Sequence, residues 1–129
     1  MTNEDKPRPS VLLIEDDTAL ADMVMTSLGE EFDFDRAGNA AEAHLLLATR
    51  AFEILLADHM LPSGQQGLDL LVEAMERYPK SRRILLTGYM NPEMLTRSVA
   101  VAGLSACLMK PIKMTDLKRI LHETLGMDV

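Results

Sequence analysis

Four consecutive apolar residues, Ile54-Leu55-Leu56-Ala57, end in the acidic residue Asp58, and the turn-forming residues Pro62-Ser63-Gly64 follow closely. A short apolar run bounded by turn residues predicts a strand that is covered on both faces. In an open α/β sheet, ligands and chemistry are found at the carboxyl ends of the strands. Asp58 is therefore expected at a functional position.

Three more strand-length apolar runs end in polar residues. Val11–Ile14 precedes Glu15-Asp16-Asp17, Ile84–Leu86 precedes Thr87-Gly88, and Ala106–Met109 precedes Lys110-Pro111. A fifth run, 32–35, alternates apolar and acidic residues, which is typical of an edge strand. If these strands are parallel, their polar ends meet at one edge of the sheet.

Segments with the helical period separate the strands. They are expected at 18–28, 39–49, 68–78 and 92–102, and a last helix carries Leu117, Ile120, Leu121 and Leu125. Asn39 with Glu42 three residues later predicts a capped helix start, and Pro92 after Asn91 predicts another. Asp17 is interpreted as a helix cap rather than a ligand. The pattern is a strand followed by a helix, five times over, with short connections, which predicts a doubly wound five-stranded parallel sheet of the α/β class.

Length and composition fit one soluble domain. Of the 129 residues, 20 are acidic and 13 basic, for a formal charge of −7, which argues against a nucleic-acid surface. We expect residues 1–9 to be a flexible lead and 10–126 the domain. One cysteine, no signal core and no 18-residue apolar stretch predict a cytoplasmic protein without membrane contact.

The polar strand ends also predict a particular chemistry. The crowded carboxylates of Glu15, Asp16 and Asp58 would raise one another's pKa unless a cation lies among them. Mg²⁺ suits oxygen ligands of this kind. Lys110 and Thr87 could hold phosphoryl oxygens by charge and hydrogen bond, beside a carboxylate able to accept the group.

In this combination of strand ends the chain resembles the receiver domains of two-component response regulators, of the single-domain, chemotaxis-regulator type. The resemblance covers residues 10–126 and implies a flavodoxin-like strand order, 2-1-3-4-5. It also implies a phosphorelay role, in which Asp58 accepts a phosphoryl group from a histidine kinase or a histidine phosphotransfer protein. Such a protein is not a turnover enzyme, although it assists its own phosphoryl transfer and dephosphorylation.

The same resemblance assigns roles to the neighbouring residues. Asp16 and Asp58 would bind Mg²⁺ directly, Glu15 would do so through water, and Met60 would contribute its backbone carbonyl. Lys110 would pair with the phosphoryl group, and Thr87 would move to donate a hydrogen bond to it. The peptide bond before Pro111 is often cis in this family.

Two departures from the family pattern concern the switch. Cys107 occupies the position of a mobile aromatic residue, and the loop from Pro62 to Gly67 is one residue longer than usual. Tyr89 is expected to edge the pocket. These departures keep open an alternative, a degenerate receiver that binds proteins without phosphorylation.

The remaining expectations concern partners and competing classes. A downstream protein target and a phosphorylation-dependent dimer are implied, and because no DNA-binding segment follows residue 126, no direct nucleic-acid contact is expected. The chain could also be part of a longer protein.

Two competing classes fit the sequence poorly. The residues after the first strand do not have the aspartate spacing of a dehalogenase-type phosphatase, and they do not form the phosphate-binding loop of a flavin carrier. The three histidines, His44, His59 and His122, lack metal-ligand spacing and are interpreted as surface or packing residues.

Overall fold

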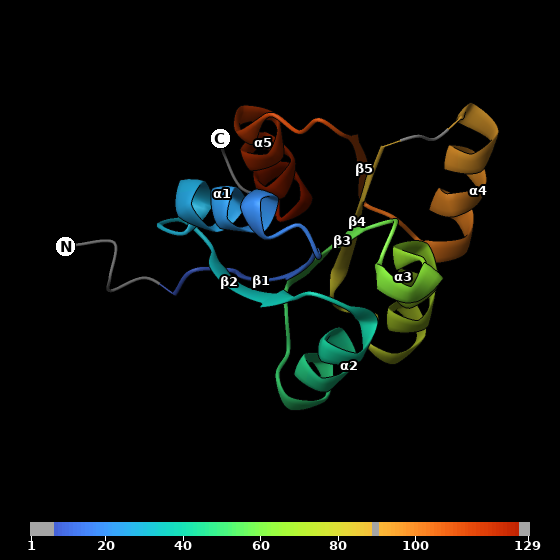
Figure 1. Cartoon of the computed structure of the whole chain (residues 1–129), viewed down its shortest axis with the longest axis horizontal. Helices are drawn as coiled ribbons and strands as arrows, with labels where there is room; N and C mark the ends of the chain where they lie inside the picture. Colours follow the sequence, from blue (N-terminus) through green and yellow to red (C-terminus); the bar gives the residue numbers. More distant parts are fainter. Residues whose placement is uncertain (1–6, 89–90, 127–129) are drawn as a thin grey trace.

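The computed structural model describes residues 7–88 and 91–126, and Figure 1 shows its arrangement. Tyr89, which was predicted to edge the pocket, lies outside the described residues, as does most of the expected N-terminal lead. Among the described residues, no helix is both long and apolar enough to cross a membrane.

Five parallel strands form one sheet in the order β2-β1-β3-β4-β5, as expected. Their bounds are β1 Ser10–Ile14, β2 Asp33–Ala37, β3 Ile54–Asp58, β4 Arg82–Thr87 and β5 Ala106–Met109. The three central strands are almost wholly buried, because helices cover both faces of the sheet. This explains why their sequences are continuously apolar rather than alternating.

The helices follow the strands in turn. Their bounds are α1 Thr18–Leu28, α2 Ala40–Thr49, α3 Gly67–Arg77, α4 Pro92–Ala102 and α5 Met114–Thr124, with a short 3₁₀ turn, η2, at Pro62–Gly64. In Figure 1, α1 and α5 lie on one side of the sheet, and α2 and α3 lie on the other.

Side-chain alternation along the strands divides the core into two layers. Val11 and Leu13 of β1 pack with α1 and α5, whereas Leu12 and Ile14 pack with α2, α3 and the end of α4. Ala102 is the buried α4 residue of the second layer. The sheet is thus sandwiched between two helical layers, and its strand ends remain the places where polar side chains can gather.

Side-chain caps fix where two helices begin. The Asp17 carboxylate accepts the Leu20 N–H at 3.2 Å, which confirms its interpretation as a cap. Asn39 Oδ1 accepts the Glu42 N–H at 2.8 Å. The Glu42 carboxylate returns to the N–H of Gly38 at 3.4 Å, one residue before the position expected of a capping box.

The edge strand differs in position from its prediction. The alternating run at 32–35 predicted a strand there, but β2 begins at Asp33 and continues to Ala37. Phe32 is fully buried against the α1–α5 layer instead of pairing in the sheet. The strand therefore begins one residue later and ends two residues later than the alternation predicts.

Candidate functional site

The polar ends of four strands meet at the carboxyl edge of the sheet. Glu15 follows β1, Asp58 ends β3, Thr87 ends β4, and Lys110 follows β5. The parallel register aligns these ends, since Ala57 lies beside Ile14 and Asp58 beside Leu86. Four residues that are distant in sequence thus face the same small region of the sheet edge.

Three carboxylates form a cluster that could hold a cation. One oxygen from each of Glu15, Asp16 and Asp58 lies within 4.8 Å of the others. Glu15 is fully buried and Asp58 nearly so, whereas Asp16 is exposed. Hard oxygen donors with one side open to water suit Mg²⁺, which keeps several of its waters when bound. The donor set therefore fits the ion that the sequence predicts.

Lys110 lies between two of these carboxylates. Its ammonium nitrogen is 2.9 Å from Glu15 Oε1 and 3.3 Å from Asp58 Oδ1, and its side chain is 27% exposed. The second oxygen of Glu15 accepts the Asp17 N–H at 3.2 Å. Both Glu15 oxygens therefore have donors, as a buried carboxylate requires.

Burial controls the electrostatics of this pair. Burial raises the pKa of Glu15 above its usual value, more than the hydrogen bonds from Lys110 and from the Asp17 amide lower it. Burial alone would lower the pKa of Lys110, but its hydrogen bond to Glu15 and the charges of Glu15 and Asp58 raise it overall. The lysine is therefore charged at neutral pH and holds two carboxylates that would otherwise repel each other.

Arg36 is a contributor that the sequence reasoning missed. From β2 it donates to the backbone carbonyls of Glu15 and Asp16, at 3.1 and 3.2 Å. These bonds hold the backbone on which the two acids are carried. An arginine in an edge strand gave no sign of this contact, which depends on the register between β1 and β2.

Thr87 and Met60 differ in exposure. Thr87 is 2% exposed at the end of β4. The Met60 side chain is 67% exposed, and the residue pairs through its backbone with Gln66. Mg²⁺ takes oxygen ligands, so the thioether of Met60 is unsuited to bind it and only the backbone carbonyl could do so.

Backbone contacts hold the loop that follows Asp58. The His59 N–H donates to Leu86 O at 2.8 Å, and the Gly67 N–H donates to His59 O at 2.7 Å. Within the loop, Ser63 and Gly64 both have positive φ, 66° and 74°. Ser63 is thus a non-glycine residue in the left-handed region, which is uncommon. The long loop turns sharply and brings the start of α3 back to the end of β3.

Gly67 permits this close approach. A Cβ at this position would lie 2.0 Å from the carbonyl oxygen of Asp58, which is backbone and cannot move aside freely. We predict that Gly67→Ala lowers the free energy of unfolding by about 2 kcal/mol or more, as overpacking does. Helix propensity would favour alanine by about 1 kcal/mol, so a loss would identify the clash.

Urea denaturation would measure the effect of Gly67→Ala, with Gly38→Ala as the control. The Cβ of Gly38→Ala would meet only the Glu42 and Arg36 side chains, at 3.6 Å or more. Equal stabilities of the two variants would contradict the proposed contact between Gly67 and Asp58.

Cys107 is half-buried in β5 against the α2–α3–α4 layer. Burial raises the pKa of its thiol, so less of the reactive thiolate is present at neutral pH. We predict that the native protein reacts with Ellman's reagent several-fold more slowly than the urea-unfolded chain, whose single thiol gives one clean signal. Equal rates would show instead that Cys107 is an exposed, redox-accessible thiol.

The histidines and Pro111 can also be placed. His44 is exposed beside Glu73 at 3.7 Å, and His122 packs its ring edge-on against Phe32. His59 is buried, and its Nδ1 has no hydrogen-bond partner among the described residues. The Lys110–Pro111 peptide bond is cis.

A five-stranded parallel sheet with acids after β1 and at the end of β3, a hydroxyl at the end of β4 and a lysine after β5 defines the class of receiver domains. The family model of the response regulator receiver domain matches residues 11–122. The chain therefore belongs to this family.

Known proteins agree with this assignment. The chain is 33% identical to the hydrogenase transcriptional regulatory protein HoxA of Cupriavidus necator, over 79% of this chain and 21% of that protein. It is 29% identical to the response regulator protein PilR of Pseudomonas aeruginosa, over 92% of this chain and 26% of that protein. The chain therefore spans about a quarter or less of these two curated relatives.

Solved structures agree as well. The chain superimposes on a CheY-like response regulator receiver domain protein from Methanospirillum hungatei with a TM-score of 0.85 and 30% sequence identity. The match covers 93% of this chain and 95% of the other.

Proposed function

We propose that Asp58 is the phosphoacceptor of this receiver domain and that the modified site switches a protein-binding surface. The observation that carries the proposal is the placement of Lys110, whose ammonium is 3.3 Å from Asp58 Oδ1 and 2.9 Å from Glu15 Oε1. A nearly buried carboxylate with a cation at one oxygen and two further acids beside it is the arrangement that phosphoryl transfer to aspartate needs.

The transfer itself is a displacement at phosphorus. One Asp58 oxygen attacks the phosphorus of a phosphohistidine, the P–N bond breaks as the new P–O bond forms, and the leaving imidazole takes up a proton. Lys110 is placed to shift from the Asp58 carboxylate to a phosphoryl oxygen as charge develops there. Thr87, at the end of the adjacent strand, can donate its hydroxyl to another phosphoryl oxygen.

The acid cluster is proposed to hold Mg²⁺ through Asp16, Asp58, the Met60 carbonyl and, by way of water, Glu15. When bound, Mg²⁺ supplies positive charge that offsets the phosphoryl oxygens. The chain's own contribution is to keep three carboxylates together. Lys110 and the Asp17 amide donate hydrogen bonds to the Glu15 carboxylate. Arg36 donates to the backbone carbonyls of Glu15 and Asp16 and so fixes the backbone that carries these acids.

Receiver domains act between histidine kinases and downstream effectors. For this chain we propose a histidine kinase or histidine phosphotransfer protein as donor, a protein as target, and a cytoplasmic location. The chain is proposed to be a stoichiometric acceptor that also speeds its own dephosphorylation, and not a turnover enzyme. Dimerisation of the phosphorylated form is a further expectation.

Intact-mass measurement after incubation with phosphoramidate, a small P–N donor, tests the proposal. We expect one phosphoryl group per chain with Mg²⁺ present, and none after EDTA. Labelling that persists in EDTA would contradict the metal role, and an absence of labelling with bound Mg²⁺ would contradict the acceptor role.

One observation favours a second candidate, a receiver that binds its partner without phosphorylation. Cys107 stands where related domains carry a mobile aromatic residue, so the usual side-chain switch is missing. A target protein that binds the wild-type chain equally well before and after phosphorylation would support this candidate.

A further inference from the structure

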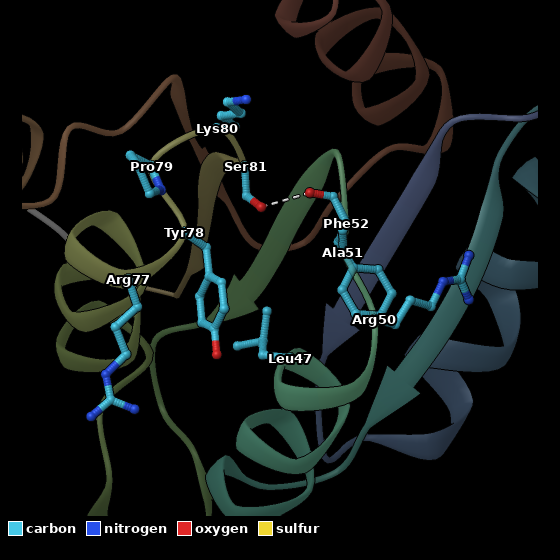
Figure 2. Close-up of a pocket in the computed structure, with 9 residues that line it drawn as sticks. All are labelled: Leu47, Arg50, Ala51, Phe52, Arg77, Tyr78, Pro79, Lys80 and Ser81. Atoms are coloured by element: carbon cyan, nitrogen blue, oxygen red, sulfur yellow. Dashed lines mark hydrogen bonds between the residues drawn. The ribbon is translucent and has the colours of Figure 1, made fainter.

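A concave region lies at the opposite edge of the sheet from Asp58. It is a pocket of about 300 Å³ formed where the chain enters β3 and β4. Its lining consists of Leu47, Arg50, Ala51, Phe52, Arg77, Tyr78, Pro79, Lys80 and Ser81 (Figure 2). Since β3 separates it from Asp58, the pocket lies roughly 15 Å from the acceptor. It is not part of the phosphorylation site.

The wall of this pocket is apolar and aromatic. The sticks of Leu47, Phe52 and Tyr78 lie toward the centre of the view in Figure 2. Leu47 and Phe52 belong to the buried core, and Tyr78 packs against it, so these side chains are held in place by the fold. The Ser81 hydroxyl donates to Phe52 O at 2.6 Å, which joins the two entering segments and leaves few polar groups facing the pocket. A flat apolar body would displace water here at little polar cost.

The charged side chains that line the pocket are all cationic. Three cations line it, Arg50, Arg77 and Lys80, and no carboxylate does, although the chain as a whole carries a formal charge of −7. In Figure 2 these three side chains lie around the periphery of the view. The pocket is therefore a basic and apolar site on an acidic protein.

The three cations are not equivalent. Arg50 is paired with Asp33 at 2.7 Å and with Asp35 at 2.5 Å, so its charge is already compensated. Among the described residues, the one ion pair of Arg77 is an exposed contact with Glu73 at 3.7 Å, which is worth little in water. Lys80 has no ion pair or hydrogen bond for its ammonium within the part of the chain that the structure describes. Arg77 and Lys80 are thus available to bind an anion, whereas Arg50 lines the pocket with its charge already compensated.

From this combination we propose that the pocket binds a small organic anion with a flat apolar body, such as an aromatic carboxylate. The apolar body would occupy the space between Tyr78 and Phe52, and the carboxylate would face Arg77 and Lys80. The volume is at the lower end for ligand pockets, which restricts the ligand to one or two rings.

Chemical-shift titration of the ¹⁵N-labelled chain tests the proposal, with benzoate, 2-naphthoate and indole-3-acetate as probes and 2-naphthamide as the neutral match of naphthoate. We expect saturable shifts at residues 47–52 and 77–81 with at least one carboxylate, and weaker binding of the amide. Equal binding of amide and carboxylate would overturn the anion recognition. Absence of saturable shifts with all three acids, or shifts confined to the Asp58 edge, would overturn the site.

Variants separate the two parts of the recognition. Arg77→Gln with Lys80→Gln is expected to weaken binding of the best probe roughly fivefold to tenfold, the order of two solvent-exposed charge contacts. Arg119→Gln on α5, which removes an exposed cation remote from the pocket lining, is expected to leave binding unchanged. Ala51→Leu would fill the pocket from an exposed lining position and should abolish binding with the fold intact. Undiminished binding in both the double variant and Ala51→Leu would contradict the proposal. Phosphorylation of Asp58 should be unaffected in all of them.

Discussion

Asp58→Asn is expected to eliminate phosphoryl labelling entirely. The amide has the shape of the carboxylate but is a poor nucleophile, and it removes one of the three clustered charges. The fold should be retained, because Lys110 keeps its 2.9 Å contact with Glu15 and the repulsion between Glu15 and Asp58 disappears. Intact mass after treatment with acetyl phosphate and Mg²⁺ measures the effect, and circular dichroism checks the fold.

Asp17→Asn is the matched control for Asp58→Asn. It makes the same chemical change only one residue beyond Asp16, but Asp17 caps α1 through the Leu20 N–H. Asparagine caps a helix about as well as aspartate, so this variant should fold and label like the wild type. Full labelling of Asp58→Asn, or equal loss of labelling in both variants, would contradict the assignment of Asp58.

Lys110→Met is expected to have the second largest effect, on both labelling and stability. Without the ammonium, the fully buried Glu15 and the nearly buried Asp58 lose their shared cation. We expect the free energy of unfolding without Mg²⁺ to fall by about 1–3 kcal/mol, the cost of leaving a buried polar group without its partner. Phosphoryl labelling should slow strongly even with Mg²⁺ present, since the ammonium beside Asp58 no longer pairs with the transferred group.

The stability loss in Lys110→Met should depend on pH in a defined direction. Burial already raises the pKa of Glu15 above its usual value of 4.5, and removal of the lysine raises it further. The folded chain then holds a proton that the unfolded chain releases, so stability falls as the pH rises from 4.5 through the raised pKa of Glu15. The deficit should therefore be larger at pH 8 than at pH 5.5.

Urea denaturation at both pH values, with and without Mg²⁺, measures this dependence. Mg²⁺ should stabilise Lys110→Met more than the wild type, because a divalent cation replaces the missing charge. Lys118→Met removes a lysine of equal charge from an exposed pair with Glu31 and should change stability by well under about 1 kcal/mol. A deficit that is independent of both pH and Mg²⁺ would indicate a packing loss instead of an electrostatic one.

The strand ends could be predicted from the sequence because they follow from local chemistry. Apolar runs such as Ile54–Ala57 have to be buried on both faces. A run of only four residues bounded by turn residues has the length of a strand rather than of a helix, so it predicts a central strand. The polar residue after each run then lies at the sheet edge, whatever the details of packing. For this reason the amino-acid sequence alone predicts the fold and the gathering of Glu15, Asp58, Thr87 and Lys110.

The contacts that complete the site join segments that are far apart in the chain. Only the tertiary structure decides which of these segments meet. Arg36 reaches the backbone of Glu15 and Asp16 through strand register, and Gly67 lies against the Asp58 carbonyl through the path of a long loop. The basic pocket forms because two strand-entry segments, 50–53 and 78–81, are brought side by side by the pairing of β3 with β4. Local patterns determine which residues are buried and where strands end, whereas register and close packing determine which of them touch.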